Sequence, residues 1–515
     1  METQQNNGVH VQNGVNGHHD DSNPKVNGVH NSEYIEADFT ERYTVYSQDE
    51  QKYENVLKQH KITTEKRVPK LGVMLVGLGG NNGSTLVAGV LANKQGLSWE
   101  TKNGTQQANF FGSFTQSATA HVGFKIDEKS GSLADVHKPV KEILPMVNPC
   151  DFEITGWDIS QMNLYEAARR SKVLEPDLLR QLKAQLENIK PLPAALNQDY
   201  IASNQADRAD NILTGTNQEI VNKLREDIQQ MKRRTDKVII LWTANTEQYY
   251  LPEIATVDDL ADKIKNNDPL PASVLYCIAA IEEQVIYLNG SPQNTFHPGV
   301  VEYARQNGGL LAGSDFKSGQ TRFKTMMSDF LIGAGLRLSS VVSYNHLGNN
   351  DGKNLSEDKC FQSKKISKGG VLDDAIASNS ILYPDGHASI DHEVVIKYVP
   401  FVGDSKRALD EYTSQIFMGG TNTISSYNIC EDSLLAVPIM IDMLVLGELL
   451  TRIKIDGNGL GPVLSYLSFF FKAPITNHSE YVVNSFSRQR HTLINFLKAA
   501  AGISPDDQTL IGFGY

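Results

Sequence analysis

Four lysines in the second half of the chain stand beside carboxylate, carboxamide or hydroxyl residues. Lys364 and Lys368 belong to the segment SKKISK, and their spacing of four would place both amines on one face of a helix. Lys406 follows Asp404 in GDSK, and a spacing of two would place both side chains on one face of a strand. Lys472 lies further on, in FKAPITN. These lysines are the first candidates for a chemical role.

Gathered ammonium groups suit two kinds of chemistry, holding a phosphate and stabilising an oxyanion or enolate as it forms. A lysine whose pKa is lowered by cationic neighbours can also relay protons. The alternative is a solvated charged face, which is the commoner situation for any single lysine. The neighbouring segment SYNHLGNNDGKN, with Asn345, Asn349, Asn350 and Asp351, favours a site. No set of residues has the spacing of a metal site, so we expect no metal.

A glycine-rich turn supplies the second candidate site. The apolar run LGVMLV (71–76) predicts a buried strand, and it ends in a turn with Gly77, Gly79 and Gly80 before a helical pattern begins. Such a strand–turn–helix unit lets the backbone approach a diphosphate, which the first amides of the helix can bind. The spacing departs from G-x-G-x-x-G, because Asn82 occupies the third position and Gly83 comes one residue late.

Later apolar runs also end in small polar residues, as expected for strands of a parallel sheet whose carboxyl ends meet at one edge. These strand ends are Thr243–Thr246 after VIILW, Gly290 and Ser291, and Asp315 with Ser318. Asp158, after FEITGW, could bind a ribose hydroxyl or cap a helix, and the sequence leaves these two readings open. Alternating strand and helix patterns predict an α/β fold with a doubly wound parallel sheet of the Rossmann type, plus an α+β domain.

Composition limits the remaining possibilities. The chain has 515 residues, a net charge of −12 and four widely spaced cysteines. The charge argues against nucleic acid and anionic membranes as partners. No apolar stretch approaches the roughly 20 residues that span a bilayer. Together with the absence of an N-terminal signal segment, this predicts a cytoplasmic protein. We expect a disordered tail (1–33), an arm packing with the C-terminal region (34–70), a cofactor domain (71–325), a catalytic and oligomerisation domain (326–440) and a C-terminal region returning to the central domain (441–515).

Taken together, these segments resemble the inositol-3-phosphate synthase (myo-inositol-1-phosphate synthase) family in its eukaryotic form. The resemblance runs from about residue 35 to the C-terminus, outside the first 33 residues. It rests on GLGGNNGSTL, GWDIS, YIASNQADRADN, LWTANTE, NGSPQNTF, GSDFKSGQT, SYNHLGNNDGKNLS, SKKISK, VIKYVPFVGDSK, CEDSLLA and FKAPIT.

The resemblance implies an isomerase (an intramolecular lyase) of inositol and phospholipid synthesis that converts D-glucose 6-phosphate to 1D-myo-inositol 3-phosphate. NAD would oxidise C5 of the substrate, enolisation and an aldol attack of C6 on C1 would close the ring, and the retained NADH would reduce the ketone. The family also implies a cytoplasmic homotetramer built through the middle domain.

The resemblance further implies roles for individual residues. Lys364 would transfer a proton at the C5 oxygen, Lys406 would stabilise negative charge beside it, Lys472 would polarise the C1 aldehyde and Lys368 would hold the phosphate. Carboxylates would orient the lysines and the nicotinamide: Asp315, Asp351, Asp404 and Asp432. The implied cofactor site comprises Gly77, Gly79, Gly80, Asn81, Asn82, Asp158, Arg208, Thr243, Ala244, Asn245, Thr246, Gly290, Ser291, Asp315, Ser318, Asn349, Asn350, Asp351, Lys364, Gly403, Asp404, Asp432 and Ser433.

Two other functions remain open from the sequence. An ordinary NAD-linked dehydrogenase of a phosphorylated sugar would use the same cleft, but it would accumulate NADH in step with product. A catalytically idle NAD-sensing or scaffold protein would be expected to lose the lysine set, yet all four lysines are present.

Overall fold

The computed structural model describes residues 33–49, 51–129, 133–385, 390–477 and 482–506. Its centre is a six-stranded parallel sheet in the order β9-β8-β3-β10-β11-β12. The strands are β3 (Leu71–Val76), β8 (Glu153–Asp158), β9 (Leu192–Pro193), β10 (Lys237–Trp242), β11 (Ile286–Asn289) and β12 (Leu310–Gly313). When only the strands of this sheet are numbered, the order is the Rossmann order 3-2-1-4-5-6. The direction in which successive strands are added reverses between β3 and β10. The predicted fold class is confirmed.

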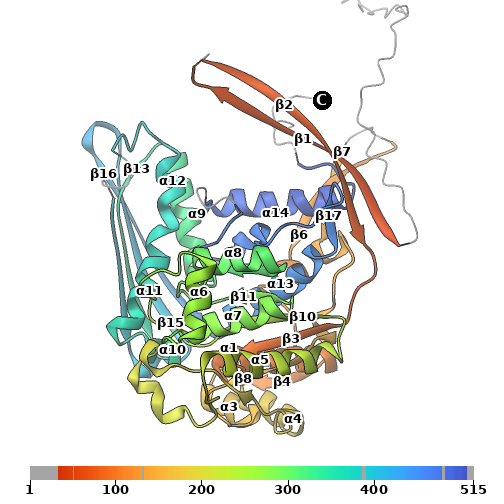
Figure 1. Ribbon diagram of the computed structural model, residues 1–515. Coiled ribbons are helices and arrows are strands. Elements are labelled where there is room, and N and C mark those ends of the chain that lie inside the picture. The colour runs from red at the N-terminus through yellow and green to blue at the C-terminus, as the bar shows by residue number, and fades with distance from the viewer. Residues whose placement is uncertain (1–32, 50, 130–132, 386–389, 478–481, 507–515) are drawn as a thin grey trace, which may run out of the picture.

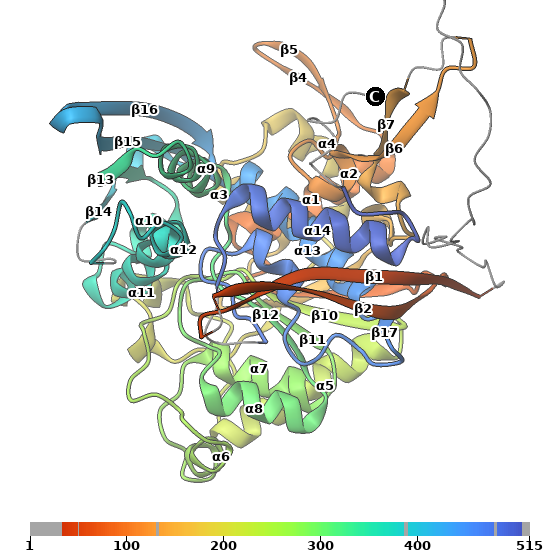
Figure 2. The same ribbon diagram turned by 90° about the horizontal axis from the view of Figure 1, so that it is seen from above.

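Helices cover both faces of this sheet (Figures 1 and 2). One face carries α1 (Asn81–Gln95), α3 (Leu164–Ser171), α4 (Pro176–Leu186), α13 (Asp432–Leu450) and α14 (Phe486–Ala500). The other carries α5 (Asn217–Lys232), α6 (Val257–Lys265), α7 (Ala272–Glu282) and α8 (Pro298–Asn307). Two apolar cores result, one on each side, because β3 is buried along its whole length as a continuous apolar strand between helical layers.

Helix α13 differs from the expectation that no apolar stretch approaches membrane-spanning length. It has 19 residues, its most apolar window has a mean hydropathy of 2.0, and 89% of that window is buried inside the protein. It packs against α1 and β10 as a core helix. Asp442 inside it is fully buried and accepts hydrogen bonds from the start of α2 (Phe114–Ser117), including 2.6 Å from the Phe114 amide.

The second sheet has the order β14-β13-β15-β16, in which β13 and β14 run parallel and the other pairs are antiparallel. Its strands are β13 (Arg337–Leu347), β14 (Asp391–Tyr398), β15 (Ser405–Gln415) and β16 (Thr421–Glu431). Its inner face carries α9 (Gly319–Gly333), α10 (Asn350–Asn354), α11 (Asp358–Gly369) and α12 (Asp373–Ala377). In Figure 1 these helices lie between the two sheets, so residues from both can reach one pocket.

A long hairpin of β1 (Tyr34–Ser47) and β2 (Lys52–Glu65) forms the arm after the N-terminus. Its inner end is anchored where Ile62–Thr64 pair with β17 (Ile453–Ile455), which follows α13. Two further hairpins interrupt the chain between α1 and β8: β4 (Ser98–Thr101) with β5 (Gly104–Gln107), and β6 (Thr119–Ile126) with β7 (Leu133–Pro139). The predicted disordered tail falls almost entirely outside the described residues.

Candidate active site

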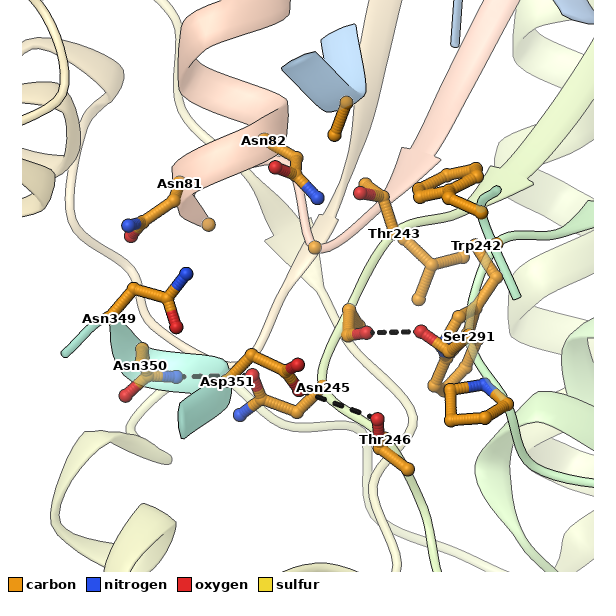
Figure 3. A pocket seen from close by; sticks show the side chains of 18 of the residues that line it. Asn81, Asn82, Trp242, Thr243, Asn245, Thr246, Ser291, Asn349, Asn350 and Asp351 are labelled. Carbon is orange, nitrogen blue, oxygen red and sulfur yellow. Dashed lines mark hydrogen bonds between the residues drawn. The ribbon is translucent and has the colours of Figure 1, made fainter. Parts of the chain in front are cut away.

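One pocket lies at the carboxyl ends of the central strands, where the sheet order reverses and where open α/β sheets bind ligands. Figure 3 shows Asn81 and Asn82 at the start of α1, Thr243 and Asn245 after β10, and Ser291 after β11 around this pocket. Asn349, Asn350 and Asp351 of the second domain face them. The pocket therefore joins the glycine-rich turn to the lysine-bearing helices.

The glycine turn is built for close approach. Gly77 has a φ of +92°, and a Cβ placed there would lie 2.9 Å from the Ala244 Cα. Gly83 performs the packing role of the displaced third glycine, because a Cβ there would lie 2.4 Å from the Leu78 carbonyl oxygen. Helix α1 has no side-chain cap and no acidic residue in its first turn, so its N-terminal amides remain suited to an anion.

Asp158 does not cap a helix, since the N-cap of α3 is Asn163. Instead its carboxylate accepts from the Gly79 amide at 2.9 Å and from the Ser160 amide at 3.0 Å. Arg170 donates to the Gly79 carbonyl at 2.6 Å, so Gly79 is held on both sides. Burial raises the pKa of Asp158, while the amide of Ser160 and the guanidinium of Arg208 oppose that shift.

Hydrogen bonds connect the end of β10 to the helices of the second domain. Asn350 donates to the Asn245 side chain at 3.1 Å, and Thr246 donates to Asp351 at 3.4 Å. Ser363 of α11 donates to the Glu247 main-chain oxygen at 2.8 Å. The cofactor-side strand and the helix that carries Lys364 and Lys368 are thus tied by direct contacts.

Asp315 lies at the centre of the lysine cluster. Its Oδ1 accepts from Lys364 Nζ at 3.1 Å and from Lys472 Nζ at 2.9 Å, and its Oδ2 accepts from Ser367 at 2.6 Å. Asp315 is 2% exposed and has a φ of +64°, in the left-handed region where aspartate is one of the more frequent non-glycine residues. The fold therefore holds two ammonium groups on one carboxylate oxygen.

The lysines of this cluster differ in proton affinity. Burial would lower the pKa of Lys364, but Asp315 and Asp351 outweigh burial and raise it. For Lys472, burial prevails over Asp315, and with Lys364 and Lys406 nearby its pKa falls to about 8. Burial and the surrounding lysines place the pKa of Lys368 well below its ordinary value. Lys472 and Lys368 can therefore exchange protons closer to neutral pH than an ordinary lysine.

The spacing of Asp404 and Lys406 predicts that both lie on one face of a strand, but Asp404 lies just outside the strand and the two have different partners. Strand β15 begins at Ser405, and Asp404 accepts from the amide and hydroxyl of Ser433, each at 2.8 Å. Lys406 instead lies 3.7 Å from Asp432, at the start of α13. The reason is the register of β15 and β16, which pairs Lys406 with Cys430 and brings the start of α13 beneath it.

Most of the residues predicted from the sequence line this pocket. Three do not: Gly79 and Asp404 support it through the hydrogen bonds described above, and the carbonyl of Gly403 accepts from the Gly348 amide. Among the charged residues that line the pocket, the prediction missed two, Arg170 and Glu247. Glu247 directly follows the polar strand end Thr243–Thr246 and is buried, and its burial raises its pKa to about 7. That position was its only sequence signal, and Arg170 had none.

The pocket residues fit NAD. The start of α1 is uncapped. Arg208 has a buried Nε with no partner among the described residues, and it lines the same pocket, close enough to Asp158 to oppose the rise of the Asp158 pKa. A diphosphate at α1 and a ribose near Asp158 would satisfy these groups. Searched over the described ranges, the chain holds no group of three or more His, Cys, Asp or Glu side chains arranged for a metal.

Comparison with known proteins agrees with this geometry. The family model for myo-inositol-1-phosphate synthase matches residues 71–498. Inositol-3-phosphate synthase isozyme 1 of Arabidopsis thaliana is 50% identical over 462 residues, covering 87% of this chain and 89% of the relative. The crystal structure of the Caenorhabditis elegans inositol-3-phosphate synthase is 43% identical with a TM-score of 0.90, covering 96% of this chain and 98% of that one. The chain therefore belongs to the myo-inositol-1-phosphate synthase family.

Proposed function

We propose that this protein converts D-glucose 6-phosphate to 1D-myo-inositol 3-phosphate, with NAD as a cofactor that is regenerated in each turnover. The observation that carries the proposal is the position of Asp315, which joins Lys364 and Lys472 in the pocket that also contains the start of α1. A site for the cofactor and a cluster of cations thus share one cleft. When bound, the nicotinamide supplies the oxidation at C5 and its later reversal.

The lysines divide the proton transfers and the charge stabilisation. Lys364 is charged at rest, because Asp315 and Asp351 overcome its burial and raise its pKa, so it suits hydrogen bonding to the C5 oxygen and returning a proton there. Lys472 shares the same carboxylate oxygen, which lets protons pass between the two amines. In its charged form Lys472 polarises the C1 aldehyde for ring closure, and Lys406 stabilises negative charge beside the C5 oxygen.

The phosphate of the substrate binds beside Lys368. This lysine is 4% exposed, and its amine lies 3.5 Å from the side-chain oxygen Oδ1 of Asn345. Helix α9 begins next to the pocket after Ser318, and its first turn contains no acidic residue. A helix N-terminus and an ammonium group together form a suitable anion site.

Incubation with D-glucose 6-phosphate and NAD tests the activity. Phosphorus NMR should show the phosphate monoester of inositol, while reduced nicotinamide does not accumulate. Accumulation of NADH in step with an oxidised sugar phosphate would instead identify a dehydrogenase and overturn the proposal.

The outer face of the second sheet supports assembly into a homotetramer. Cross-strand neighbours form a mostly apolar row across it: Val395, Tyr344, Leu409 and Tyr427. Tyr344 is 49%, Leu409 44% and Tyr427 62% exposed, and in Figure 1 no helix of the described residues covers this face. Apolar patches of this kind mark protein interfaces. In light scattering, Leu409→Arg should lower the particle mass, whereas Leu251→Arg at another exposed leucine should not; an unchanged mass for both would exclude this face.

A cytoplasmic location is supported by the cysteines. Cys150, Cys277, Cys360 and Cys430 are all free thiols, as is usual in a reducing compartment. Cell fractionation should recover the protein with soluble cytoplasmic markers, and recovery with organelles would contradict this assignment.

A further inference from the structure

A buried lysine that is absent from the pocket lining is linked through His392 to the end of the helix that carries Lys368. Lys324 is on the second turn of α9 and is 3% exposed. Its Nζ is 3.1 Å from Nε2 of His392 on β14. Lys324 has no role in the proton transfers and charge stabilisation proposed above.

The hydrogen bonds of His392 locate the positive charge on Lys324. The His392 ring also bonds to the backbone of Gly369, the residue that follows Lys368 at the end of α11. Burial, and then Lys324, lower the pKa of His392 to about 3. The imidazole is therefore neutral, and its Nε2 accepts from the lysine while the ring anchors the end of the helix that carries Lys368.

Few charged groups face Lys324. Asp410 on β15 supplies the nearby negative charge, but its carboxylate oxygens already accept from Gln320 at 3.1 Å and from the Tyr412 hydroxyl at 3.3 Å. Burial outweighs Asp410 and lowers the pKa of Lys324 to about 8. Toward the pocket, the neighbouring charge is that of Lys368, whose own pKa Lys324 helps to depress.

Two buried lysine side chains therefore lie together with less negative charge than would keep both amines protonated. Lys368 opens into the pocket and contacts only an amide oxygen there among the described hydrogen bonds, whereas Lys364, Lys472 and Lys406 lie beside carboxylates. A phosphate monoester carries nearly two negative charges at neutral pH. Such a ligand would compensate both cations while touching only Lys368.

We propose that Lys324, held by His392, is a positioning residue for the substrate: it acts as a second cation behind Lys368 and strengthens binding of the phosphate ester without contacting it. The inference rests on the proposed function, because it concerns the phosphate of the same substrate.

The variant Lys324→Gln isolates the charge, since the amide can still donate to His392. A unit charge acting over about 8 Å at an effective dielectric constant of about 20 changes affinity by roughly tenfold or more. We expect the KM for glucose 6-phosphate and the inhibition constant of inorganic phosphate to rise at least about tenfold. The kcat and the affinity for NAD should change little. Lys498→Gln, which removes a buried lysine of α14 paired with Asp506, should leave both constants unchanged.

A second variant covers the case in which Lys324→Gln does not fold. In the native protein the KM should rise as pH exceeds about 8, where Lys324 loses its proton. The rise should be smaller in Lys324→Arg, because a guanidinium keeps its charge there while the titration of Lys368 is common to both proteins. Native phosphate affinity in Lys324→Gln, or the same rise of KM in Lys324→Arg, would overturn the inference. A native protein that does not turn over glucose 6-phosphate would instead refute the proposed function.

Discussion

Replacing Asp315 with asparagine removes the charge that two buried lysines share. The Asp315 Oδ1 lies 3.1 Å from Lys364 Nζ and 2.9 Å from Lys472 Nζ, and all three side chains are almost inaccessible. Each pair attracts with about 5 kcal/mol at an effective dielectric constant of about 20, before the cost of desolvation. Because the amines can release protons, we expect a smaller net loss, about 3–5 kcal/mol in the free energy of unfolding.

The loss of stability in Asp315→Asn should be larger at lower pH. The pKa of Lys472 is about 8, below its ordinary value, so between the two values the unfolded chain binds more protons and stability rises with pH. Without Asp315 the pKa of Lys472 falls further, so burial of Lys472 lowers the free energy of unfolding over a pH range that extends to lower pH. The penalty of Asp315→Asn should therefore be larger near pH 7 than near pH 9. The pKa of Lys364 is raised in the folded protein. The stability that Lys364 gains from Asp315 therefore persists below its unfolded pKa of about 10.4 and is lost only above that pH.

Denaturant unfolding at both pH values measures this penalty, and turnover is followed by phosphorus NMR. We expect kcat to fall at least about a hundredfold while NAD still binds. Asp442→Asn is the matched control, because it removes another buried carboxylate, one held by the start of α2. It should destabilise the protein but leave turnover in the folded fraction. If Asp315→Asn keeps the stability and turnover of the native protein, Asp315 does not hold the two lysines in the way described.

Three further outcomes follow from the site. Lys364→Ala should lower kcat by about 10²–10⁴ with little effect on the calorimetric affinity for NAD, and preserved turnover would remove Lys364 from its role. Gly77→Ala should weaken NAD binding about tenfold, because its φ is +92° and its Cβ would meet Ala244, whereas Gly89→Ala in α1, with open space around it, should bind NAD normally; equal affinities would contradict this. Turnover at saturating substrate should fall above about pH 8 as Lys472 loses its proton, and a flat profile would show that its charge is not needed.

The local features of both sites could be predicted from the sequence. Residues 71–83 specify a buried strand, a glycine turn and a helix, and the spacing of Lys364 and Lys368 places both on the pocket side of α11. Such features depend on neighbours within a few residues. Asp158 follows the glycine turn much later in the sequence than the ribose-binding acid of a standard Rossmann unit, because two hairpins are inserted between α1 and β8.

Contacts between distant segments could not be predicted. Lys406 faces Asp432 because of the register of β15 and β16, and Asp404 turns to Ser433 for the same reason. Arg170 reaches Gly79 only because α3 packs beside α1. These partners are set by tertiary packing, for which local sequence spacing carries no signal.

In the proposed reaction, one hydrogen leaves C5 of the substrate and returns to the same molecule within this pocket. Glucose 6-phosphate deuterated at C5 tests it directly, with mass spectrometry of the product and of the NAD released from the protein. We expect an inositol phosphate that retains the deuterium, with none in free NADH. Loss of the label to solvent or its appearance in free NADH would contradict it.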